Sequence, residues 1–266
     1  MYKKTILITI FIILCWFLWL KYNMISRKYL KIYTNYKKTN NINIISYNIG
    51  LLPFNIKNLD ILEKIIINYD IILLQEFFTN LFLSKKNWLL DFCKKHKYNI
   101  VTKEDISLSS GKLVDSGLVI MSKYPITKVS QTCFKSYAFS FDKLANKGFL
   151  HAVIKINNKE LSLYNLHNQS FYTKFKNPYF IQNYQLRKLN NYIDKKDKYI
   201  IIGGDFNIES KYSTNIIKSM KVFNSKNPTI YIKYDKSNNE LYSTSEEEEG
   251  LTSYNLDYYL TKNVDL

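Results

Sequence analysis

Carboxylate, amide and imidazole side chains follow short apolar runs at four places in the sequence. Apolar runs of this length are typical of buried strands, so each polar group is expected at a strand end. The last of these runs, residues 199–202, passes through Gly203 and Gly204 before its polar pair. The polar candidates are Asn48, Glu76, Asn165 with His167, and Asp205 with Asn207.

These residue types together match the requirements of metal-assisted phosphodiester hydrolysis. A hard cation such as Mg²⁺ prefers carboxylate oxygen and keeps several waters, a role that suits Glu76. A second carboxylate must orient or deprotonate the attacking water, which suits Asp205, and donors such as Asn207 and His167 must meet the charge that builds on the phosphate. Taken singly, each residue also has a simpler interpretation: Asn207, for example, could cap a following helix.

Strands and helices alternate along the part of the chain that must position these groups. Period-2 and continuous apolar runs predict strands, and an apolar stripe at helical spacing predicts each helix. Such a mixture predicts an α/β or α+β protein in which helices cover sheets. The expected strands are residues 43–47, 71–74, 117–122, 149–156, 160–165 and 199–202, and the expected helices are 58–68, 85–97 and 178–194. Within these elements His96 is expected to face solvent, and His151 is expected to be an ordinary strand residue.

The first residues predict a membrane segment. Residues 5–20 are an apolar run bounded by Lys3, Lys4 and Lys21, which is typical of a signal-anchor or signal-peptide core. No small-residue cleavage site follows, which favours an uncleaved single-pass anchor. We therefore expect a transmembrane segment at 1–24, a polar basic tether at 25–41 and one catalytic-type domain at 42–266. The export signal and the positive-inside rule predict opposite orientations, so the side of the membrane stays open. A cleaved segment would instead give a secreted protein.

The net charge indicates which class of partner the chain could bind, and the cysteines indicate whether it has a disulfide framework or a cysteine metal site. The formal net charge of +16 suggests an anionic partner, either nucleic acid or a membrane surface. The chain is also rich in Lys, Asn, Ile and Tyr, and this compositional bias weakens the inference of a specific basic binding surface. Cys15, Cys93 and Cys133 have neither the number nor the spacing of a disulfide framework or a metal site.

Several motifs resemble the endonuclease/exonuclease/phosphatase superfamily. "SYNIG", "LLQE", "NLHNQ", "GGDFN" and "NLDYYL" occur in the order found in that superfamily. The stretches "YNIGLLPFNI", "DSGLVIMSKYPI" and "FDKLANKGFLHAVI" are most similar to its bacterial sphingomyelinase C branch. The resemblance implies a four-layered α/β sandwich of two packed mixed sheets flanked by helices, a Mg²⁺ cofactor and a phosphodiesterase activity.

The resemblance also implies roles for individual residues. Asn48 and Glu76 would hold the metal, Asp205 would act on the nucleophilic water, and His167 and Asn207 would contact the scissile phosphate. Asp115 would support the site, and Asp257 would orient a catalytic histidine. Phe77 and Phe78 follow the metal ligand, either as core residues or at a lipid-facing rim.

The sequence departs from the family in one respect that bears on activity. Family members continue to a Ser-Asp-His stretch, whereas the histidines here are His96, His151 and His167. We therefore expect the last strand of the fold to be absent and catalysis to be impaired. Leu166 also stands where the family has threonine.

Three functions are compatible with the sequence. The first is hydrolysis of sphingomyelin or a related phospholipid headgroup at a membrane. The second is a truncated, non-catalytic, membrane-associated relative, and the third is a metal-dependent endonuclease, which only the basic charge favours. A lipid substrate accounts for both the apolar N-terminus and the sphingomyelinase-like stretches, so it is preferred over nucleic acid.

Overall fold

A computed structural model describes most of the chain outside its N-terminal linker and its C-terminal loops. The described residues are 2–22, 41–50, 59–78, 83–102, 112, 114–134, 140–170, 178–194, 196–208, 220, 224–226, 231–235, 240–244 and 257–264.

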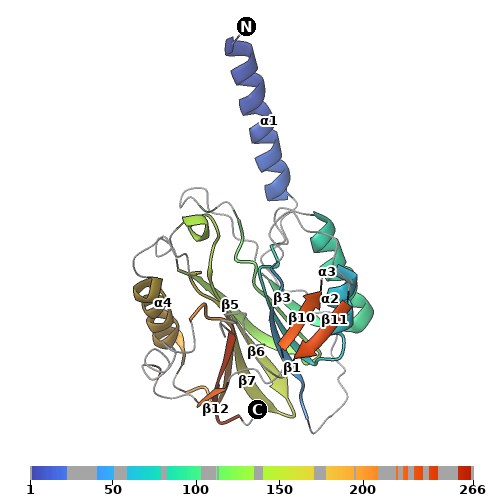
Figure 1. Ribbon diagram of the computed structural model, residues 1–266, viewed down its shortest axis with the longest axis vertical. Coiled ribbons are helices and arrows are strands. Elements are labelled where there is room, and N and C mark those ends of the chain that lie inside the picture. Colours follow the sequence, from blue (N-terminus) through green and yellow to red (C-terminus); the bar gives the residue numbers. More distant parts are fainter. Residues whose placement is uncertain are drawn as a thin grey trace.

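Four layers build the main body, and they confirm the predicted α/β sandwich of two mixed sheets (Figure 1). Helices α2 (Leu59–Ile66) and α3 (Leu83–His96) cover one sheet, and α4 (Pro178–Tyr192) covers the other. Three apolar clusters fill the spaces between successive layers. The wholly buried strand β2 (Ile71–Gln75) shows the principle, because its side chains alternate between faces. Ile72 packs in the cluster under the helices, and Leu73 packs in the cluster between the sheets.

The smaller sheet has four strands in the order β1-β2-β4-β3. Its members besides β2 are β1 (Ile44–Asn48), β4 (Val119–Ser122) and β3 (Asn99–Thr102). β1 and β2 are parallel, and the other pairs are antiparallel. The strands β1 and β2 therefore end at the same edge, and Asn48 faces Gln75 in register there.

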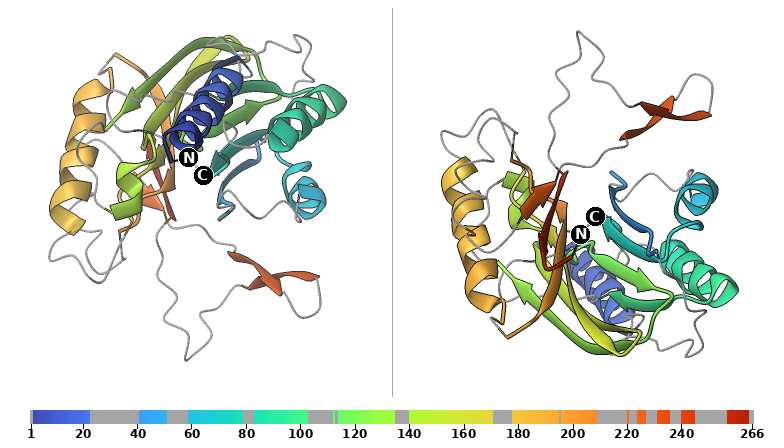
Figure 2. Two further views of the ribbon diagram at one scale, coloured as in Figure 1. Left: turned by 90° about the horizontal axis from the view of Figure 1, so that it is seen from above. Right: turned by 90° about the horizontal axis from the view of Figure 1, so that it is seen from below.

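The larger sheet has six strands in the order β5-β6-β7-β8-β12-β9. They are β5 (Ile126–Cys133), β6 (Gly148–Ile156), β7 (Lys159–His167), β8 (Tyr199–Asp205), β12 (Asp257–Lys262) and β9 (Asn224–Lys226). β7 and β8 are its parallel pair, and His167 faces Asp205 at their ends. The 3₁₀ turn η2 (Ser140–Lys143) precedes β6. A separate hairpin of β10 (Tyr231–Asp235) and β11 (Glu240–Thr244) stands apart from both sheets (Figure 2).

The two glycines near the end of β8 are required by close packing. A Cβ on Gly203 would lie 2.7 Å from Cδ1 of Leu73 in the facing sheet. A Cβ on Gly204 would lie 2.1 Å from the carbonyl oxygen of Leu166, and the φ of Gly204 is +141°, a value that other residues rarely adopt. Glycine at both positions lets β8 approach its neighbours closely and brings Asp205 beside β7.

The structure does not support the predicted N-terminal membrane segment. Helix α1 (Tyr2–Tyr22) extends away from the sandwich (Figure 1). No helix among the described residues is long and apolar enough to span a bilayer. The predicted tether at 25–41 lies outside the described residues except for its last position.

Candidate active site

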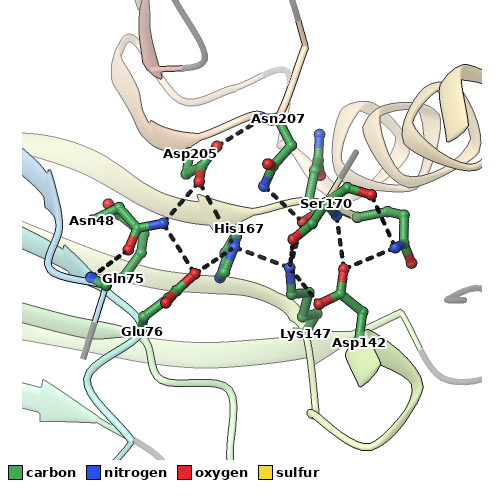
Figure 3. A network of polar contacts seen from close by, with 12 residues as sticks. Asn48, Gln75, Glu76, Asp142, Lys147, His167, Ser170, Asp205 and Asn207 are labelled. Carbon is green, nitrogen blue, oxygen red and sulfur yellow. Dashed lines mark hydrogen bonds and ion pairs between the residues drawn. The ribbon is translucent and has the colours of Figure 1, made fainter. Parts of the chain in front are cut away.

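Five of the predicted residues meet at one edge of the sandwich (Figure 3). The parallel strands β1 and β2 end there in one sheet, and β7 and β8 end there in the other. Each strand therefore delivers a polar side chain to the same place, as the sequence pattern predicts. The five are Asn48, Glu76, His167, Asp205 and Asn207.

The Asn48 side chain connects the two sheets. Its Nδ2 donates to Oδ2 of Asp205 at 2.8 Å and to Oε1 of Glu76 at 3.3 Å. Its Oδ1 accepts a hydrogen bond from the backbone N–H of Gly50 at 3.0 Å. Two carboxylates from different sheets thus converge on one small polar group.

His167 is a buried, neutral imidazole. Its Nε2 lies 3.0 Å from Nζ of Lys147, and an ammonium group can only donate, so Nε2 is the acceptor and the proton lies on Nδ1. Burial, and next the positive charge of Lys147, hold the pKa of His167 well below its ordinary value. Nε2 also lies 3.8 Å from Oδ2 of Asp205 and 3.9 Å from Oε1 of Glu76, so the imidazole is packed against both carboxylates.

Lys147 is the main site residue that the sequence reasoning missed. Its side chain is 4% exposed and its Nζ lies 2.9 Å from Oδ1 of Asp142, whose side chain is 8% exposed. Nζ also donates to the carbonyl of Asn168 and to Oγ of Ser170. The available signal was a carboxylate in η2 followed by a lysine directly before β6, within "FDKLANKGFLHAVI".

Asp205 has the electrostatics of a group that can hold or release a proton. Burial raises the pKa of its carboxyl to about 6, the charge of Glu76 adds to the rise, and hydrogen bonds from Asn48 and Asn207 oppose it. The backbone N–H of Asn207 donates to Oδ1 of Asp205 at 2.8 Å.

Glu76 and Asn207 share an unusual backbone conformation. Their φ angles are 61° and 53°, in the left-handed region that residues other than glycine rarely occupy. Hydrogen bonds to both the side chain and the backbone carbonyl of Asn207 hold this conformation. Its Nδ2 donates to the carbonyl of Asn168 at 3.2 Å, and its own carbonyl accepts from Nε2 of Gln182 at 2.6 Å.

The turn that contains Asp115 lies against the backbone that carries Glu76. Its carboxylate accepts the N–H of Gly117 at 2.8 Å, and the carbonyl of Gly117 accepts the N–H of Phe77 at 2.9 Å. A Cβ on Gly117 would lie 3.0 Å from Cα of Glu76, so the two turns are in contact. Asp115 is therefore placed to support the backbone that carries Glu76.

The remaining predicted residues have mixed outcomes. Asp257 begins β12 and faces Asp205 in register, while its side chain lies outside what the structure describes. Phe77 and Phe78 are 0% and 6% exposed, which makes them core residues and not a lipid-facing rim.

The prediction for His96 is wrong, whereas His151 is a strand residue as expected. The His96 side chain is 15% exposed, with its Nε2 2.9 Å from Oε1 of Glu63 and its ring 4.7 Å from that of Phe92. His151 lies within β6 and stacks on Tyr164 with ring centroids 4.3 Å apart. Both imidazoles therefore have structural partners of their own.

The donor set fits a hard divalent cation with few protein ligands. Among the described residues there is no group of three or more His, Cys, Asp or Glu side chains arranged to hold a metal. Two carboxylates, Glu76 and Asp205, nevertheless lie within 3.3 and 2.8 Å of a single amide nitrogen. The Glu76 side chain is 21% exposed, which leaves it open to water. Mg²⁺ is commonly held by one or two carboxylates and several waters, so these residues suit it.

Comparison with known proteins places the chain in a family. Residues 45–218 match the Endonuclease/Exonuclease/phosphatase family, and the chain belongs to it. A crystal structure of a beta toxin mutant from Staphylococcus aureus with bound magnesium ions has the same fold, with a TM-score of 0.64 at 22% identity over 84% of each chain.

Two curated relatives are similar to the chain in sequence. Sphingomyelinase C of Bacillus cereus is 26% identical over 208 residues, which cover 68% of this chain and 61% of the relative. Phospholipase C of Staphylococcus aureus is 34% identical over 112 residues, which cover 40% of this chain and 34% of the relative. The chain thus spans less than two thirds of the length of either relative.

Proposed function

We propose that this chain is a Mg²⁺-dependent phosphodiesterase of the sphingomyelinase C type, acting on sphingomyelin or a related phospholipid headgroup. The observation that carries the proposal is the convergence of Glu76 and Asp205 from two different sheets beside His167 and Lys147. Carboxylates and cationic donors at one point are what hydrolysis of an anionic diester needs. The sphingomyelinase relatives support the choice of a lipid substrate.

The carboxylates have separate tasks in this proposal. Glu76, which is partly exposed, would be the main metal ligand, and Asn48 would fix its position relative to Asp205. The bound Mg²⁺ would supply Lewis acidity to a phosphate oxygen. Asp205 would accept a proton from the attacking water, because its pKa of about 6 leaves it ionised at neutral pH yet basic enough to act.

The donors on the other side of the cluster would stabilise the phosphate. The Lys147 ammonium and the Asn207 amide would meet the negative charge that grows on the non-bridging oxygens as water attacks phosphorus. His167 is neutral and accepts from Lys147 through Nε2, and so holds the ammonium group beside the imidazole that contacts Glu76 and Asp205. The P–O bond to the lipid alcohol breaks as the bond from the water oxygen to phosphorus forms. The leaving alkoxide takes a proton from solvent water, and the proton that Asp205 accepted returns to solvent.

Substrate class can be tested with one protein preparation. Vesicles of sphingomyelin, vesicles of phosphatidylcholine and duplex DNA are each incubated with the chain and Mg²⁺. We expect phosphocholine release from sphingomyelin, reduced at least about 100-fold in the Asp205→Asn variant, as expected when a general base is lost. The matched control is Asp91→Asn, which neutralises an exposed carboxylate on α3.

Other outcomes would select the alternatives. Cleavage of DNA without cleavage of phospholipid would identify a metal-dependent nuclease, which the net charge of +16 favours. A folded protein that cleaves none of the three would identify a non-catalytic relative.

A further inference from the structure

Two buried amides join the sheets directly behind the site. Gln75 is the last residue of β2 and Asn165 lies near the end of β7, and both side chains are 0% exposed. Nε2 of Gln75 donates to Oδ1 of Asn165 at 2.7 Å. Nδ2 of Asn165 donates to the carbonyls of Leu74 and Val119 at 2.8 and 2.9 Å. These three hydrogen bonds cross from one sheet to the other.

The surroundings make these amides unusual. The layer between the sheets is otherwise filled by residues such as Leu73, Ile120 and Leu163, all 0% exposed. Apolar packing is non-directional, so it resists separation of two layers better than a small slide of one over the other. Hydrogen bonds of 2.7 to 2.9 Å between fully buried groups are directional, and a slide would leave them unsatisfied at a high cost.

The same two residues are adjacent to four members of the site. Gln75 is followed directly by Glu76 and faces Asn48 in register. Asn165 faces Gly203 in register, and two residues further along the same pair of strands His167 faces Asp205. The bond between the amides therefore lies between the two groups of side chains that must converge.

We propose that Gln75 and Asn165 are positioning residues for the reaction. Their hydrogen bond sets how the two sheets align, and so sets the separation of Glu76 in one sheet from Asp205 and His167 in the other. The proposal rests on the proposed function for its kinetic readout and on the geometry of the sheets for its structural one. Neither residue contacts substrate in this account.

A double-mutant cycle tests the proposal. Gln75→Met, Asn165→Leu and the double variant are assayed at a temperature where urea titration shows each one folded. Replacing both amides with apolar groups restores part of the stability that either single change removes, because neither amide is left facing an apolar side chain, although the carbonyls of Leu74 and Val119 still lose a donor. We expect kcat for phosphocholine release to stay about 100-fold down in the double variant, since a misplacement of about 1 Å can have that effect.

The matched control is Asn99→Leu. Asn99 is also 0% exposed, lies in the same small sheet, and donates through Nδ2 to the carbonyls of Ser122 and Tyr124 at 3.2 and 2.9 Å. It should lose stability as Asn165→Leu does and keep the wild-type kcat. A second readout needs no substrate: the Mg²⁺ concentration that gives half of the thermal stabilisation should rise about tenfold in the double variant and stay constant in Asn99→Leu.

The positioning role and the proposed function fail in distinguishable ways. Recovery of kcat together with stability in the double variant, or an equal kcat loss in Asn99→Leu, would overturn the positioning role. A wild-type chain that releases no phosphocholine would overturn the proposed function, and the Mg²⁺ midpoint would then decide on positioning alone. If Asn165→Leu fails to fold, Gln75→Met, which keeps the Asn165 bonds to Leu74 and Val119, carries the same test.

Discussion

Replacing Lys147 with methionine should affect stability and rate in separable ways. The change keeps the length of the side chain and removes the ammonium group that contacts both His167 and Asp142. Breaking a buried ion pair by removing one partner typically costs about 3–5 kcal/mol. The carboxylate of Asp142 keeps hydrogen bonds from the N–H of Ser170 at 2.7 Å and from Nε2 of Gln169 at 2.8 Å. The loss should therefore lie near the lower limit, at about 3 kcal/mol.

The rate should fall for a different reason. One preorganised group that meets a developing oxyanion is worth about 10²–10³ in kcat, and the buried positive charge of Lys147 is proposed to act in this way. The double variant Asp142→Asn/Lys147→Met removes the unpaired charge while an amide oxygen can still accept from Ser170. Its free energy of unfolding should return toward that of the wild type, and its kcat should stay low.

Urea unfolding and Mg²⁺-saturated turnover measure the two effects on the same samples. The control is Lys188→Met, which removes a lysine that donates to the carbonyl of Cys133 from α4, away from the carboxylates. If the double variant regains kcat together with stability, Lys147 acts only through the ion pair, and the proposed electrostatic effect of its charge on the phosphate is wrong.

Three further changes test other parts of the site. Glu76→Gln should remove most of the stabilisation by Mg²⁺ at a concentration that gives the wild type about 2.7 kcal/mol, a hundredfold excess over its Kd. An equal rise of Tm in both proteins would remove Glu76 from the metal site. Gln182→Met removes the side-chain amide that donates to the carbonyls of Asn207 and Gln169 at 2.6 and 2.8 Å. Loss of this positioning contact should lower kcat at least about tenfold. The Mg²⁺ concentration that gives half of the thermal stabilisation should not change. Burial lowers the pKa of His151, so the unfolded chain takes up its proton first as the pH falls, and stability is lost below about pH 6.5. His151→Phe keeps the stack on Tyr164 and should reduce that loss, measured by urea midpoints above and below this pH; an identical acid loss would contradict the assignment.

The location of the site was predictable because it depends on local patterns. Buried strands read as apolar runs, and a polar residue directly after such a run must lie at a sheet edge. The parallel pairs β1–β2 and β7–β8 then bring Asn48, Glu76, His167 and Asp205 to one edge. The glycines of "GGDFN" were visible, but their reason, contact with Leu73 and Leu166, lies in the packing of other strands.

The residues that were missed depend on tertiary contacts. Lys147 is one of 38 basic residues, and only the turn that places Asp142 beside it distinguishes it from a surface lysine. His96 was predicted to be exposed because lysines surround it in the sequence, whereas Glu63 from another helix partly buries it. Strand β5 was not predicted, since most of its residues are partly or fully exposed and show no clear apolar alternation.

Glu76 and Asp205 are proposed to form a Mg²⁺-dependent phosphodiesterase site. The most direct measurement is phosphocholine release from sphingomyelin vesicles over a Mg²⁺ titration, with the wild type compared with Glu76→Gln and Asp205→Asn. We predict release that rises with Mg²⁺ and saturates in the wild type, needs much more Mg²⁺ in Glu76→Gln, and is nearly absent at every concentration in Asp205→Asn. Release that is independent of Mg²⁺, or equal in all three proteins, would contradict the account.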